Sequence, residues 1–107
     1  AYTNAAECAL RNGNTTRAET DLLTAVQLDP TFVTPSLMLA DIKFKAGDAR
    51  AAREHLARYV RRAGQTPAGL ALGIRVETAL GDLDRAASYR LLLKDRFPDS
   101  REARELN

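Results

Sequence analysis

The residues best able to do covalent or metal chemistry in this 107-residue chain are its only cysteine, Cys8, and its only histidine, His55. One cysteine cannot form a disulfide within the chain, and neither residue completes a metal site without further ligands. The two lie far apart in the sequence, so a Cys–His nucleophilic pair is not expected. The carboxylates are dispersed among arginines and do not form the isolated pair that general acid–base catalysis uses. We therefore predict that the chain is not an enzyme and has no catalytic residue, metal or cofactor.

A cluster of arginines is the strongest local charge feature. It faces a single nearby acid, Glu54, and consists of Arg50, Arg53, Arg58, Arg61 and Arg62. One interpretation is a surface that binds anionic lipid head groups or an acidic partner. The other is a solvated helix face whose cations complement the C-terminal end of the helix. The spacing does not turn four of the five to one side, which favours the second interpretation.

The overall composition is that of an ordinary single globular domain. Hydrophobic residues make up 45% and charged residues 28%, and the formal net charge is +2. Nucleic-acid binding is not expected, because such domains carry a denser basic stripe. No run of eighteen apolar residues predicts a transmembrane helix.

An internal repeat determines which elements must position these residues. A Gly–Asn or Gly–Asp pair begins at Gly13, Gly47 and Gly81, with a spacing of 34 residues each time. Equivalent alanines recur at the same spacing, and so do Pro30 and Pro98, with Gly64 at the middle equivalent. The alanines are Ala18, Ala52 and Ala86. One further position is not kept, since it holds Leu22, Leu56 and then Arg90.

Each recurring residue type suits one helical hairpin per repeat. Glycine adopts the left-handed conformation that ends a first helix. The Asn or Asp after it accepts backbone N–H groups at the start of the second helix. The alanine lets the two helices cross closely. Pro30 and Pro98 end a helix because proline lacks an N–H group, and Gly64 ends the middle one as a C-cap.

The signals divide the chain into seven helices and no strand, since no segment alternates with a period of two. We place the helices near 1–12, 15–28, 33–46, 49–62, 67–80, 83–97 and 99–106. Apolar spacing predicts buried faces on the second, fourth and sixth helices. Their members are Leu22, Ala25, Val26 and Leu28; then Leu56, Tyr59 and Val60; then Leu83, Ala86, Ala87, Leu91 and Leu93.

A period of 34 residues with this pattern is typical of the tetratricopeptide repeat (TPR). The sequence therefore predicts an all-α fold, a right-handed superhelix of three TPR helical hairpins plus a short C-terminal capping helix. The single array over 1–107 would comprise repeats at about 1–32, 33–66 and 67–98 and a final helix at 99–107, whose charged outer face meets water. We also expect the small apolar residues of the first helix to have stacked on further repeats upstream.

The first helices of such an array line a concave surface that binds protein segments. We predict that Leu37, Met38, Phe44 and Leu72 supply an apolar strip there, although packing between repeats is an alternative role for Met38 and Phe44. The complete predicted groove is Thr3, Asn4, Glu7, Leu37, Met38, Asp41, Phe44, Lys45, Leu72 and Arg75. Leu10, Ala68 and Ala71 share these inward positions.

Chaperone-binding repeats of this class carry a carboxylate clamp of Lys and Asn at the fifth and ninth repeat positions. The equivalent pairs in this chain are Thr3 and Glu7, Leu37 and Asp41, and Ala71 and Arg75. An acidic peptide terminus would meet two carboxylates, so a co-chaperone function is not expected.

Beyond the repeat positions, the sequence holds further blocks at 2–9, 13–14, 18–19, 52–53, 58–59, the Leu-Gly-Ile-Arg block at 72–75, 81–82, 86–89 and the Phe-Pro-Asp-Ser block at 97–100. These blocks resemble the C-terminal half of the type IV pilus biogenesis lipoproteins of the PilF/PilW pilotin family. The resemblance spans the whole chain, and the two named blocks are its most specific parts.

The resemblance implies a non-catalytic scaffold that supports outer-membrane localisation and multimerisation of the pilus secretin. It implies a place at the periplasmic face of the outer membrane, held by an N-terminal lipid that is absent from this chain. It also implies that Cys8 is half of a disulfide with an earlier repeat; a small buried cysteine in a helix seam is the alternative. A generic TPR adaptor in another bacterial envelope complex is the alternative function.

Overall fold

Seven α-helices follow one another in the computed structural model, which describes the backbone of residues 2–106 and the side chains of residues 5–106. Every end lies within two residues of its predicted position, and the described residues form no strand. The helices are α1 (Tyr2–Arg11), α2 (Thr15–Leu28), α3 (Thr34–Lys45), α4 (Ala49–Ala63), α5 (Pro67–Leu80), α6 (Leu83–Arg96) and α7 (Arg101–Glu105).

The repeated glycine turn is built as the sequence predicts. Gly13, Gly47 and Gly81 have φ angles of +77°, +85° and +82°, in the left-handed region that residues with a side chain rarely adopt. The Asn or Asp after each glycine then caps the next helix; for example, the Asp48 side chain accepts a hydrogen bond from the backbone N–H of Ala51 at 3.1 Å. One turn geometry therefore joins the two helices of all three hairpins.

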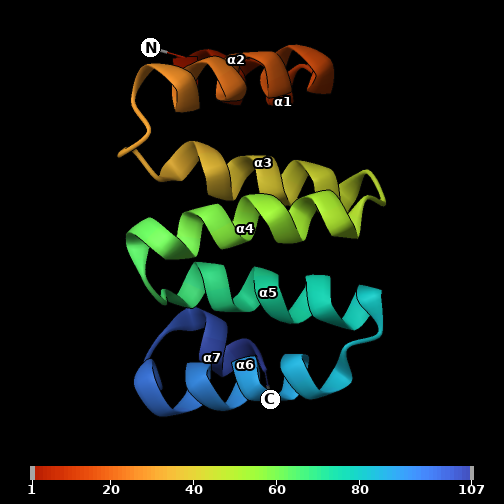
Figure 1. Ribbon diagram of the computed structural model, residues 1–107, viewed down its shortest axis with the longest axis vertical. Helices are drawn as coiled ribbons and strands as arrows, with labels where there is room; N and C mark the ends of the chain where they lie inside the picture. The colour runs from red at the N-terminus through yellow and green to blue at the C-terminus, as the bar shows by residue number, and fades with distance from the viewer. Residues whose placement is uncertain (1, 107) are drawn as a thin grey trace.

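The hairpins stack along the long axis of the molecule, as Figure 1 shows. The helices α1 and α2, α3 and α4, and α5 and α6 pack as antiparallel pairs, while α2 with α3 and α4 with α5 join neighbouring pairs. The short α7 packs on both α5 and α6 at the C-terminal end. This arrangement places α1, α3 and α5 on one side of the stack and α2, α4 and α6 on the other.

The recurrent alanines occupy the points where paired helices approach. Ala18 and Ala52 are 0% exposed and Ala86 is 1% exposed. Protein interiors are packed to crystal-like density, so no space remains at such a crossing for a larger side chain. The burial of all three alanines is what the predicted close crossing of paired helices requires.

Two of the three core clusters join neighbouring hairpins, and the third joins the last hairpin to α7. The first joins the first hairpin to Leu39 and Ile42 of α3, and the second joins α3 and α4 to Leu72 and Val76 of α5. The third, which contains Leu70, joins α5 to α6 and α7. Since each cluster draws on consecutive elements, the array is stabilised by contacts between neighbours, as in other repeat proteins.

Two of the three predicted apolar faces extend too far. Leu28 is 67% exposed, Leu83 is 65% exposed, Leu91 is 64% exposed, and Ala87 is exposed as well. On α6 these positions follow one another at four-residue intervals and form the face turned away from α5, whereas Ala86 faces inward. The short α7 does not cover that outer face of α6, so Leu83, Ala87 and Leu91 are exposed to solvent.

Candidate protein-binding groove

A cavity of about 390 Å³ opens on the side of the stack formed by α1, α3 and α5. It reaches from the first hairpin to the C-terminal helix, which lies behind α6 in Figure 1. Its lining consists of Leu10, Leu37, Met38, Asp41, Ala68, Ala71, Leu72, Arg75, Arg101, Glu102 and Glu105. We call this cavity the groove.

The floor of the groove is apolar and continuous with the core. Leu10 and Met38 pack against the first core cluster, and Leu37 packs against the second, which contains Leu72. The first three of these side chains remain half-buried, so part of each faces the groove. An apolar floor of this kind gains free energy when a partner's apolar side chain covers it.

The rim of the groove carries charges that differ in how they are paired. Asp41 forms an ion pair with Lys45 at 3.0 Å, and Arg101 forms one with Glu105 at 3.5 Å. Arg75 is exposed and makes no ion pair within the described part of the chain. Its guanidinium is therefore available for a carboxylate brought by a partner.

The structure brings five of the predicted groove residues together and places three others elsewhere. Leu37, Met38, Asp41, Leu72 and Arg75 line the groove. The other three are Glu7, Phe44 and Lys45, which do not line it; Thr3 and Asn4 lie outside the residues whose side chains are described.

Phe44 packs on the second core cluster, as does the half-buried Leu80 of α5. It lies in the last turn of α3, where the side chain reaches the seam between hairpins and not the groove. Lys45 reaches the groove only indirectly, through its ion pair with Asp41.

Sequence reasoning missed the contribution of α7. Its charges were expected to face water as the outer surface of a cap, but Arg101, Glu102 and Glu105 form one wall of the groove. Ala103 anchors the helix, since it is buried in the third core cluster. The signal was the single small apolar residue among charges, which fixes the inward side of so short a helix.

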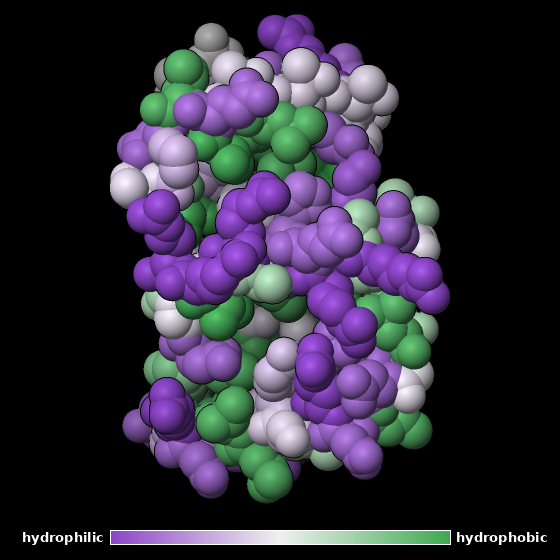
Figure 2. Space-filling model, viewed as in Figure 1, coloured by the Kyte–Doolittle hydropathy of each residue, from purple (hydrophilic) through white to green (hydrophobic). Residues whose placement is uncertain are grey.

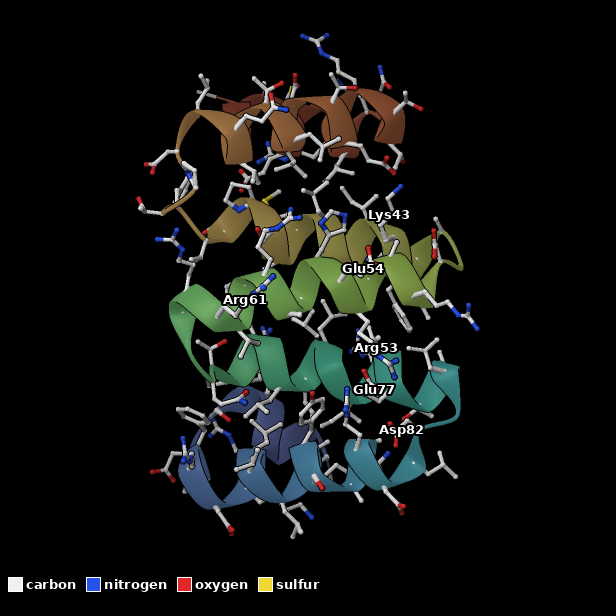
Figure 3. All side chains as sticks on the ribbon, viewed as in Figure 1. Lys43, Arg53, Glu54, Arg61, Glu77 and Asp82 are labelled. Carbon is white, nitrogen blue, oxygen red and sulfur yellow. The ribbon has the colours of Figure 1, made fainter. Side chains whose placement is uncertain are left out.

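A second missed feature is a buried ion pair between α4 and α5. Figure 3 shows Arg53 directed toward Glu77, the only acid on α5 and only 2% exposed. The Arg53 Nε donates to a Glu77 carboxylate oxygen at 2.9 Å, and the Nη2 donates to the other oxygen. This hydrogen bonding raises the pKa of Arg53 above its ordinary value. The pair joins the second and third hairpins and takes Arg53 out of the arginine surface.

His55 is half-buried on α4, and its Nδ1 has no hydrogen-bond partner among the described residues. Burial lowers the pKa of His55, and the positive charges of Arg58 and Lys43 lower it further, against smaller opposing effects of Glu54 and Glu19. A buried nitrogen without an acceptor and two nearby cations both disfavour the imidazolium ion.

Cys8 is exposed on α1, so the alternative of a cysteine buried in a helix seam is wrong. The sequence predicts that the small apolar residues of α1 stack on an upstream repeat, but Ala6 and Ala9 are buried in the first core cluster, against α2 and α3. Cys8 lies on another face of the same helix.

No cluster of three or more His, Cys, Asp or Glu side chains is arranged to hold a metal ion in the part of the chain that the structure describes. Across the same residues, no helix is both long enough and apolar enough to cross a membrane.

Comparison with protein families matches residues 9–75 to the tetratricopeptide repeat. Among curated proteins, the chain is similar to the type IV pilus assembly protein PilF of Pseudomonas aeruginosa, with 37% identity over 70 residues, which is 65% of this chain and 28% of that protein.

Two solved structures share the fold. One is PilW, described as a widely conserved type IV pilus biogenesis factor, with a TM-score of 0.87, 27% identity, and coverage of 98% of this chain and 48% of that one. The other is P. aeruginosa PilF, with a TM-score of 0.81, 28% identity, and coverage of 98% and 47%. The chain thus spans about half the length of both structures. These matches confirm the predicted all-α TPR fold and the resemblance to PilF and PilW.

Proposed function

This chain belongs to the tetratricopeptide repeat family, and on that basis we propose that it is a pilotin-like, non-catalytic scaffold of type IV pilus assembly. In this function it supports the outer-membrane localisation and multimerisation of the pilus secretin. The observation that carries the proposal is the match of 98% of the chain to PilW, a type IV pilus biogenesis factor. The curated similarity to a pilus assembly protein supports the same assignment.

In this proposed function, the partner protein binds in the groove. Its volume accommodates a few side chains, and its floor of Leu10, Leu37, Met38 and Leu72 suits apolar ones. The free guanidinium of Arg75 would take a carboxylate near the bound segment. We therefore expect the partner to present an apolar segment with an acidic residue beside it.

The same lining favours binding over catalysis. Three of its five charged side chains, Asp41, Arg101 and Glu105, are held in ion pairs, and its remaining surface is aliphatic. Catalytic sites instead hold titratable groups poised against each other or against a reacting atom. The scaffold therefore acts by holding a partner and not by converting one.

Retention of the purified pilus secretin of the same organism on the immobilised full-length protein tests the proposal. We expect retention by the wild type, weaker retention by Arg75→Glu, and unchanged retention by Arg90→Glu. Arg90 is the matched control because it is exposed on α6, outside the groove. A strain lacking the gene should lose secretin multimers from its outer membrane.

The proposal fails if the secretin is not retained and its multimers remain normal in the deletion strain. If another envelope complex is lost in that strain, the chain is a TPR adaptor in that complex. Retention of that complex by Arg75→Glu and Arg90→Glu then tests whether the new partner binds in the groove.

A further inference from the structure

A second hollow, of about 330 Å³, lies on the opposite side of the stack, between α2, the following loop and α4. Arg58, Arg61 and Arg62 line it together with Ser36. Its apolar lining comes from Val26, Pro30 and Val33. Figure 2 shows hydrophilic side chains gathered in a band over α4 on this side of the molecule.

The three arginines converge because they are spaced by three and four residues along the last turns of α4. Figure 3 places Arg61 at the end of α4 that lies nearer the loop between α2 and α3. All three side chains are exposed, and none makes an ion pair within the described residues. Three cations thus surround one recess without an acid to balance them.

The residues that line the hollow include no acid. Asp29, next to Pro30 in the chain, stays a charged carboxylate because hydrogen bonds from Thr31 lower its pKa, but it forms no ion pair with the three arginines within the described residues. Arg58 also contributes to the lowered pKa of His55, as expected of a nearby cation.

Cations are favoured at the C-terminal end of a helix, which explains some of the arginines at the end of α4. It does not explain the recess that they surround. Arg61 and Arg62 lie in the last turn, where a cation is favoured. Arg58 lies one turn earlier, and all three enclose an apolar recess. A face built only for solvation has no need of such a recess.

We propose that this hollow binds an acidic segment of a protein partner, in which carboxylates flank one apolar side chain. Guanidinium groups bind carboxylates through two parallel hydrogen bonds, and three of them around the recess can hold at least two carboxylates. The apolar side chain between these carboxylates would enter the recess and cover Val26 and Val33. A membrane surface is a poorer occupant, because a planar array of head groups cannot fill an apolar recess.

The hollow and the groove lie on different sides of the stack and share no lining residue. The full-length protein could therefore hold an apolar segment on one side and an acidic segment on the other. This inference does not depend on the identity of the partner in the groove.

The test uses the full-length protein and a fluorescein-labelled peptide, Glu-Glu-Leu-Glu-Glu, with binding followed by fluorescence anisotropy. The triple variant Arg58→Gln, Arg61→Gln, Arg62→Gln should weaken binding by at least about tenfold. The matched control, Arg50→Gln, Arg90→Gln, Arg96→Gln, removes the same charge outside the hollow and should bind within about twofold of the wild type, because screening weakens distant charges. Arg75→Glu in the groove should also leave peptide binding unchanged.

Two further arms test the nature of the occupant. A Glu-Glu-Ser-Glu-Glu peptide should bind more weakly than the leucine peptide if the apolar recess takes part. Vesicles of phosphatidylglycerol and phosphatidylcholine should bind the hollow variant and the control triple variant equally, because the two have lost the same charge. Equal loss of peptide binding in both triple variants, or loss confined to the vesicles, would overturn the proposal. A thermal melt confirms that each variant is folded, and Arg61→Gln alone replaces the triple variant if that one unfolds.

Discussion

At the scale of single residues, the buried pair of Arg53 and Glu77 is asymmetric. The Arg53 side chain keeps 40% of its surface exposed, whereas that of Glu77 keeps 2%. If Glu77 is removed, Arg53 can turn toward water. If Arg53 is removed, the carboxylate stays buried without its partner, which is the costlier outcome.

We therefore expect Arg53→Met to lower stability markedly, while Arg50→Met on the same helix changes it by less than about 0.5 kcal/mol. Adding Glu77→Leu to Arg53→Met should restore stability to within about 1 kcal/mol of the wild type, since apolar replacement of a whole buried pair is often neutral. Urea unfolding of the four proteins measures this. A double variant no more stable than Arg53→Met would show that the stranded carboxylate is not the cause.

His55 gives a pH dependence at the same scale. Its pKa in the folded protein lies below the ordinary value of 6.5, chiefly through burial. As pH falls, the unfolded chain therefore takes up this proton first. The contribution to stability is present in full above about pH 6.5 and is lost as the pH falls through the folded-state pKa.

The wild type should accordingly lose more stability than His55→Gln between about pH 7.5 and pH 5, because only the wild type carries this titrating group. Because the carboxylates titrate in both proteins, the difference between them isolates the histidine. Urea unfolding at a series of pH values provides the measurement. If the free energies of unfolding of the two proteins change in parallel with pH, His55 does not contribute to the pH dependence.

At the scale of elements, the close crossing of paired helices explains why a small residue recurs at the alanine position of each repeat. Ala52→Leu should destabilise the protein by about 1–3 kcal/mol, because its added atoms have no space at the crossing of α3 and α4. Ala57→Leu on the exposed side of α4 is the matched control and should change stability by less than about 0.5 kcal/mol. A thermal melt of each variant measures the effect. Equal melting temperatures for Ala52→Leu and the wild type would show that the crossing is loose.

The elements also show what a single sequence predicts well. The helices and turns follow from local signals, such as glycine at a left-handed position followed by an Asp cap, so Gly47 and Asp48 identify their turn without tertiary information. Burial on α6 is different. Leu83 and Leu91 match a core pattern but stay exposed, because their burial depends on a neighbour long enough to cover them.

The same distinction applies to the groove. Leu37, Met38 and Leu72 were predicted because repeat position fixes the side on which they lie. Phe44 has the same kind of repeat position but packs in the seam between hairpins. The repeat position alone does not predict which way a large side chain in the last turn of a helix packs. For α7, Ala103 indicates which side of the helix faces inward, but the position at which the helix docks is a tertiary property that the repeat does not give.

At the scale of the whole molecule, the stack presents two faces of different chemistry. The α1, α3 and α5 side carries the apolar groove, and the α2, α4 and α6 side carries the arginine-lined hollow. Both cavities are formed by the packing of the hairpins in the structure of this chain alone. A pre-formed site avoids much of the ordering cost of binding, which suits a scaffold.

The central claim is that the groove contacts the partner protein, and site-specific photo-cross-linking in cells tests it most directly. The full-length protein would carry benzoylphenylalanine either in place of Ala68, exposed within the groove, or in place of Leu83, exposed on the outer face of α6. We predict an adduct with the secretin from position 68 and none from position 83. Secretin adducts from position 83 alone, or none from position 68 in a strain with functional pili, would contradict the account.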